Sequence, residues 1–137
     1  MHRTFIRNLD ALQQVFGFVA EFLAPIDPRT LNHKEIQLVV EELFTNFLRH
    51  NRDGTNEIGI ELQLYRERIE VVVTDTDVEP FDITQVPEIP LDQPLEQRRG
   101  GGMGLQLVRT IADKLSYEYS DRTSRVTVEK QLELGNV

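Results

Sequence analysis

The stretch that most constrains the fold lies between residues 36 and 50, where apolar and polar side chains separate onto two faces of a predicted helix. Seven apolar positions recur at helical spacing and predict a face that packs against a core: Ile36, Val39, Val40, Leu43, Phe44, Phe47 and Leu48. Glu42, Asn46 and His50 follow one another at intervals of four residues, so they project along one stripe. The stretch therefore predicts a long core helix that carries a polar stripe.

Two members of this stripe, Glu42 and Asn46, can form a small polar site one helical turn apart. The amide oxygen of Asn46 can ligate a hard cation such as Mg²⁺. Glu42 can then accept a proton from a hydroxyl group or a water molecule near that cation. The alternative is an ordinary solvated helix face. Residues 41–50 taken alone favour that alternative, because Glu and Asn are common on such faces.

Length and composition narrow the class of protein. The 137 residues are enough for one domain, placed at 1–137, and 39% hydrophobic residues indicate a folded chain. No apolar run is long enough to cross a bilayer, and the first residues do not have the pattern of a secretory signal. The chain has no cysteine, which excludes disulfides and thiolate zinc sites. These features are compatible with a cytoplasmic protein.

The charge balance bears on the class of partner. Fifteen Lys and Arg residues against 23 Asp and Glu residues give a formal net charge of −8. This charge repels a phosphate backbone, so we do not expect a nucleic-acid partner. It does not exclude a nucleotide, because a metal ion and one or two local arginines can offset the phosphate charge.

The other periodic segments predict a mixed chain of helices and strands. In order, they are a weak strand over 4–7, helices over 10–23 and 32–50, strands over 57–65 and 69–74, a helix over 103–115, and strands over 116–120 and 125–134. Asn8 or Asp10 can cap the first helix, which is expected to bury Phe16, and Asn32 or Thr30 can cap the second. This order predicts an α/β two-layer sandwich: a mainly antiparallel sheet with helices on one face.

Residues 75–102 do not fit this periodic pattern, since they hold four prolines and end in a triple glycine. A segment of that length without secondary structure usually has a function in a compact domain, although a tolerated insertion is the alternative. Asp75 stands at its start, directly after a predicted strand. At its end, backbone amides and the dipole of the next helix favour an anion near a glycine-rich turn. That turn consists of Gly100, Gly101, Gly102, Met103 and Gly104.

Together with Glu42 and Asn46, these features stand in an order that resembles a known family over about residues 5–132. The sequence is similar to the anti-sigma-factor serine kinase branch of the histidine-kinase-like ATPases, which have the Bergerat nucleotide-binding fold. The resemblance rests on a helix motif at 42–50, an adenine box at 75–82, a second glycine box at 101–109 and the closing strands. The helix motif and the second glycine box are specific in combination.

The resemblance implies an ATP site with Mg²⁺ in a protein serine/threonine kinase. Asn46 is then the Mg²⁺ ligand, Glu42 the base toward a substrate serine, and Asp75 the acceptor for the amino group of adenine. Thr127 is implied to support the same edge of adenine, directly or through water. The phosphate-binding backbone is implied to consist of Gly100, Gly101, Gly102, Met103, Gly104 and Leu105.

The resemblance also implies a lid and protein partners. Residues 83–99 are the implied lid, in which Arg98 or Arg99 can offset phosphate charge. The implied phosphoacceptor is a small anti-sigma-factor antagonist, and a sigma factor is a further implied partner. A homodimer is expected from the family, and a short N-terminal edge strand can pair with its copy.

The adenine box departs from the family pattern, which usually reads Asp-x-Gly. Asp77 stands at the glycine position, and Glu79 adds a residue before the Pro-Phe-Asp at 80–82. Asp tolerates a left-handed backbone less well than Gly, and both carboxylates add negative charge near the nucleotide. The departure predicts weak nucleotide affinity and leaves open a non-catalytic protein-binding module. A third interpretation is a plain ATPase or a detached histidine-kinase catalytic domain, although the chain has no dimerisation helix pair with a phosphoacceptor.

Overall fold

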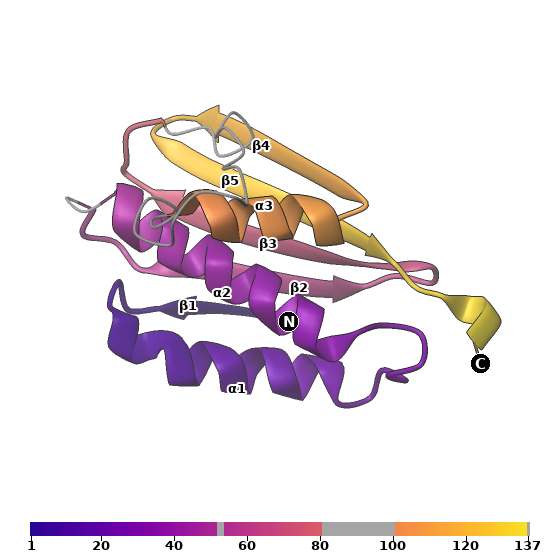
Figure 1. The fold of residues 1–137 in the computed structure, drawn as a ribbon. Helices are drawn as coiled ribbons and strands as arrows, with labels where there is room; N and C mark the ends of the chain where they lie inside the picture. The colour runs from indigo at the N-terminus through magenta and orange to yellow at the C-terminus, as the bar shows by residue number, and fades with distance from the viewer. Residues whose placement is uncertain (52–53, 81–100, 137) are drawn as a thin grey trace.

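Five antiparallel strands form one sheet in the residues that the computed structural model describes, which are 1–51, 54–80 and 101–136 (Figure 1). The strand order is β1-β2-β3-β5-β4. The strands are β1 (His2–Phe5), β2 (Ile58–Leu64), β3 (Arg68–Thr76), β4 (Lys114–Ser120) and β5 (Thr123–Gln131). The central position of β3 places its end, with Asp75, between β2 and β5.

Figure 1 shows that the helices cover one face of this sheet. They are α1 (Leu12–Leu23), α2 (His33–His50) and α3 (Gly101–Ile111), and short 3-10 turns at Leu9–Ala11 and Leu134–Asn136 flank the array. α2 contacts both α1 and α3, so it is the middle helix of the layer. The predicted two-layer sandwich, with an antiparallel sheet and helices on one face, is confirmed. No described helix is both long enough and apolar enough to span a bilayer.

The predicted apolar face of α2 is the centre of the core. Its buried members are Ile36, Val39, Val40, Leu43, Phe44 and Phe47. They pack on sheet residues that include Ile60, Ile69, Val71, Val73, Val126 and Val128. Asn32 caps the helix by accepting from the Glu35 amide at 3.2 Å, and Arg49 and His50 in the last turn complement the helix dipole. The core therefore fixes the position of the helix that carries Glu42 and Asn46.

The structure corrects several details of the sequence prediction. α1 begins at Leu12 rather than near residue 10, because a 3-10 turn that Asn8 caps comes first. Phe16 is 39% exposed, and Phe18 is buried in its place. Leu115 belongs to β4 rather than to the third helix, which ends at Ile111. The first strand covers His2–Phe5 rather than 4–7.

β3 also differs from the buried run that three consecutive valines suggest. Its burial alternates strictly, with Val71, Val73 and Asp75 buried toward the helices and Val72 half-buried on the other face. The helices cover only one face of the sheet, so only alternate residues are fully enclosed. This alternation puts the Asp75 side chain on the same side of the sheet as α2.

Candidate functional site

The polar stripe of α2 places a half-buried carboxylate one turn before a buried amide. Asn46 is 1% exposed, and its Oδ1 atom has no hydrogen-bond partner in the part of the chain that the structure describes. A buried polar atom without a partner is costly, so such an atom in a folded protein commonly bonds a water molecule, an ion or a ligand. The Asn46 amide oxygen therefore fits the role of a cation ligand.

Glu42 lies directly against Gly104, in the first turn of α3. A Cβ atom at Gly104 would overlap the Glu42 carboxylate. Glycine at this position thus permits close approach between the start of α3 and the polar stripe of α2. The helix motif and the second glycine box, which are far apart in the sequence, meet in the structure.

The surroundings of Glu42 change its acidity. Partial burial raises the pKa of Glu42 above its ordinary value, the neighbouring Glu41 carboxylate raises it further, and Arg49 opposes both effects. A carboxylate with a raised pKa is a stronger proton acceptor than an exposed one. The raised pKa of Glu42 and its position beside the start of α3 are compatible with a general base.

Asp75 is fully buried near the end of β3, with protein donors on both of its oxygens. Arg7 pairs with Oδ1, and the side-chain amide of Asn51 donates to Oδ2 at 2.9 Å. Asn51 is the residue directly after α2. The sequence prediction included Asp75 but neither of these two partners, because both come from segments distant in the sequence.

The register of β3 and β5 changes one predicted site residue. Asp75 is paired with Ser124, which is fully buried on the same face of the sheet. Thr127 is paired with Val72, and the alternation of β5 turns it to the face away from the helices. The structure therefore does not bring Thr127 to Asp75. Ser124 occupies that place, and its hydroxyl lies 3.3 Å from the hydroxyl of Tyr117.

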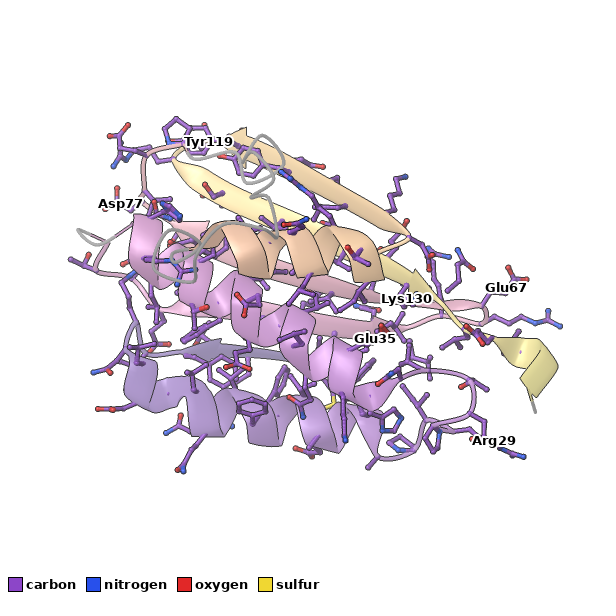
Figure 2. The ribbon with its side chains drawn as sticks, in the orientation of Figure 1. Arg29, Glu35, Glu67, Asp77, Tyr119 and Lys130 are labelled. Atoms are coloured by element: carbon purple, nitrogen blue, oxygen red, sulfur yellow. The ribbon has the colours of Figure 1, made fainter. Side chains whose placement is uncertain are left out.

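The departure in the adenine box is accommodated by the β4–β5 turn. Asp77 has the left-handed backbone of a glycine position, with a φ of 58°. Arg122 donates to Asp77 at 2.9 Å and to Glu79 at 3.0 Å, and these bonds raise the pKa of Arg122. The backbone amide of Val78 donates to the carbonyl oxygen of Arg122, and the Tyr119 hydroxyl donates to the carbonyl oxygen of Val78. Figure 2 shows Asp77 and Tyr119 at the same end of the sheet.

A hollow of about 240 Å³ lies beside this turn. Its lining consists of His50, Asn51, Gly54, Asp77, Val78, Glu79 and Arg122. Asn51 links this hollow to Asp75, since it is one of the lining residues and its side chain bonds that carboxylate. The hollow is smaller than whole-ligand pockets, which are usually about 300–1,000 Å³, and Asp75 is not among its lining residues.

The glycine box is described in part. α3 includes the backbone of Gly101, Gly102 and Met103, and Leu105 is buried in the core. Gly100 and the predicted lid at 83–99, with Arg98 and Arg99, lie outside the described residues. α3 begins at Gly101 rather than at the predicted residue 103, so residues 101–104 form the first turn of the helix instead of a turn ahead of it.

The Asn46 oxygen suits a cation that takes its other ligands from a bound substrate and from water. Among residues 1–51, 54–80 and 101–136, no cluster of three or more His, Cys, Asp or Glu side chains is arranged to hold a metal ion. Mg²⁺ commonly takes one or two protein ligands and completes its shell with water and phosphate oxygens. The unpartnered Asn46 oxygen, next to a carboxylate and a glycine-rich helix start, matches that type of site.

The contact at Gly104 predicts a smaller gain in stability than an open helix position gives. Gly104→Ala is expected to raise the free energy of unfolding by less than Gly17→Ala does, because its added methyl group must turn the Glu42 carboxylate aside. Gly17→Ala in α1 is the matched control: no atom lies within 4 Å of its added Cβ, so it is expected to stabilise by about 0.5–1 kcal/mol. Urea denaturation measures both changes, and equal effects of the two substitutions would refute the close approach at Gly104.

Comparison with known proteins finds a matching family and similar chains. The family model described as histidine kinase-like ATPase domain matches residues 5–130. The serine-protein kinase RsbW of Listeria monocytogenes is 34% identical over 110 residues, which cover 73% of this chain and 69% of that kinase. RsbW of Halalkalibacterium halodurans is 34% identical over 86 residues, or 60% of this chain, and the match spans only 52% of that kinase's length.

Solved structures are similar in fold. A crystal structure of the RsbU and RsbW domains of a Mycobacterium tuberculosis protein aligns with a TM-score of 0.66 at 15% identity, over 96% of this chain and 32% of that one. The histidine kinase domain of a blue-light activated kinase from Erythrobacter litoralis aligns with a TM-score of 0.51 at 18% identity, over 93% and 62% of the two chains.

Proposed function

From its membership of the histidine kinase-like ATPase domain family, in the branch of the anti-sigma serine kinases, we propose that this chain binds ATP with Mg²⁺ and phosphorylates a serine of a small antagonist protein. The observation that carries the proposal is the meeting of three groups. The unpartnered Asn46 oxygen, the Glu42 carboxylate and the glycine start of α3 belong to one site. In the proposal, the Asn46 oxygen binds the cation, the Glu42 carboxylate accepts the proton, and the start of α3 binds the phosphates.

The chain's own residues act mainly by positioning. When bound, Mg²⁺ and ATP supply a transferable phosphoryl group whose negative charge is partly offset. Asn46 presents its amide oxygen to the cation from a helix that the core holds rigidly. Glu42 accepts the proton of the serine hydroxyl, which its raised pKa favours. The backbone at the start of α3 offers amide donors and the positive end of a helix dipole to the phosphates.

For the adenine ring, we place the amino group at Asp75 and assign the supporting hydroxyl to Ser124 rather than Thr127. Ser124 is the register partner of Asp75 and is buried on the same face. A carboxylate accepts from the amino group of adenine and repels the keto oxygen that guanine presents at the same position. This arrangement favours ATP over GTP.

Arg122 bears on whether the altered adenine box still functions. Arg122→Ala is expected to weaken ATP binding by about two- to tenfold, because Asp77 and Glu79 lose the cation that offsets their charge. Asp77→Gly in the Arg122→Ala background is expected to restore part of the affinity, since it removes one carboxylate and the left-handed Asp. Fluorescence titration with a labelled ATP analogue measures these affinities. If Arg122→Ala binds ATP as tightly as the parent, the compensation by Arg122 is wrong.

The partners follow from the family in the same way. We propose a small antagonist protein as the phosphoacceptor and a sigma factor as a second protein partner, with homodimers as the functional form. β1 is an edge strand, paired only with β2 among the described strands, and an edge strand can add a strand from a second copy.

A phosphotransfer assay tests this function. The chain is incubated with Mg·ATP and the purified antagonist protein, and phosphoserine on the antagonist is followed by mass spectrometry. We expect stoichiometric phosphorylation of one serine. A complex that forms without phosphate transfer, with ATP present, would instead establish the non-catalytic binding module.

A further inference from the structure

Arg7 is almost enclosed by protein at the end of the sheet that carries Asp75. Its side chain is 10% exposed, and its guanidinium donates to Asp75 and to the carbonyl oxygens of Asn51 and Asn56 at 3.3 and 3.2 Å. Gly54 makes room for it, since a Cβ there would lie 2.6 Å from the Arg7 Cζ atom. A guanidinium held by three acceptors in a fixed fork has little freedom to reorient.

The bonds from Arg7 and Asn51 fix the plane of the Asp75 carboxylate. Arg7 binds Oδ1, and Asn51 donates to Oδ2 at 2.9 Å. Each carboxylate oxygen has two lone pairs, so one acceptor position remains on each oxygen after these bonds. An unpaired buried charge is costly, and Arg7 is the cation paired with Asp75. The orientation of the acceptor therefore depends on Arg7.

The place of this carboxylate indicates what it can recognise. Asn51 lines the hollow at the end of α2, and Ser124 is the register partner of Asp75. A charged acceptor at this position suits a ring that presents a hydrogen-bond donor, such as the exocyclic amino group at C6 of a purine. A purine without that group leaves the buried carboxylate without its ligand donor.

We propose that Arg7 is a positioning residue that makes the site selective for 6-aminopurines by holding the Asp75 carboxylate in its accepting orientation. The proposal rests on the proposed ATP site. It predicts that Arg7 acts on the amino group alone and not on the phosphates or the ribose.

The test compares ATP with purine riboside 5′-triphosphate, which lacks only the amino group, by isothermal titration in the presence of Mg²⁺. The wild-type chain is expected to bind ATP about tenfold more tightly. In Arg7→Met, which keeps an unbranched apolar chain but no guanidinium, the ratio of the two affinities is expected to fall toward one. Arg7→Lys keeps a cation opposite Asp75 but not the fork that fixes the carboxylate, so its ratio is expected to fall to a value between those of the wild type and Arg7→Met.

The ratio separates positioning from stability, because both triphosphates are measured on the same variant. If Arg7→Met and Arg7→Lys lower both affinities in parallel and keep the wild-type ratio, Arg7 is only a structural ion pair and the proposal is overturned. If Arg7→Met does not fold, the ratio in Arg7→Lys decides: a reduced ratio supports the proposal, and an unchanged one overturns it. If the wild type binds neither triphosphate, the proposed function itself is wrong.

Discussion

Glu42→Gln is expected to abolish most phosphate transfer to the antagonist while the chain still binds ATP. The substitution preserves the shape of the side chain beside Gly104 but removes the group that accepts the serine proton. General base catalysis typically contributes about 10²–10⁴-fold, so we expect the rate to fall within that range. A single-turnover assay with saturating Mg·ATP and antagonist measures the transfer step directly.

Glu41→Gln is the matched control, because it makes the same change in charge one residue away. Glu41 raises the pKa of Glu42 but does not lie on the stripe with Asn46. We expect Glu41→Gln to change the rate by only a few fold. Comparable rates for Glu42→Gln and the parent would assign the proton transfer to another group.

Asn46→Leu is expected to remove the Mg²⁺ dependence of ATP binding. The substitution keeps the number and branching of the side-chain heavy atoms and eliminates the amide oxygen that lacks a protein partner. Loss of a direct ligand is expected to weaken binding of Mg·ATP by about 10²-fold, at least as much as the loss of a group that only orients a ligand. Affinity measured with Mg²⁺ and with EDTA should then be similar in the variant and very different in the parent.

The free energy of unfolding of Asn46→Leu serves as the control for this prediction. The Asn46 Oδ1 atom forms no hydrogen bond within the described chain, so the fold loses no such bond when that oxygen is removed. The free energy of unfolding is therefore expected to change by less than about 1.5 kcal/mol. If Asn46→Leu unfolds the chain but leaves the Mg²⁺ effect intact in the folded fraction, Asn46 is a structural residue.

The parts of the fold that depend on local periodicity were predictable from sequence. α2 has the expected buried face and the expected Asn32 cap, because both arise from residues within one helix. The two-layer arrangement also followed from the order of helices and strands. In α1 most of the expected stripe is buried, but Phe18 is buried instead of Phe16, since packing against α2 and β1 selects the face.

The parts of the site that depend on long-range pairing were not predictable from a single sequence. Whether Ser124 or Thr127 lies beside Asp75 is decided by the register of β3 and β5, and a shift of one residue reverses the face. Arg7 reaches Asp75 across the sheet, and no local pattern around Arg7 indicates that contact. The opposed positions of Asp77 and Arg122 likewise depend on how the β4–β5 turn meets the end of β3.

The proposed function requires that a divalent cation and an adenine triphosphate bind together between α2 and the start of α3. Isothermal titration of the chain with ATP, once with Mg²⁺ and once with EDTA, tests this claim most directly. We predict a saturable heat at one ATP per chain that is strongly reduced in EDTA. The absence of binding heat at millimolar ATP with Mg²⁺ present would contradict it.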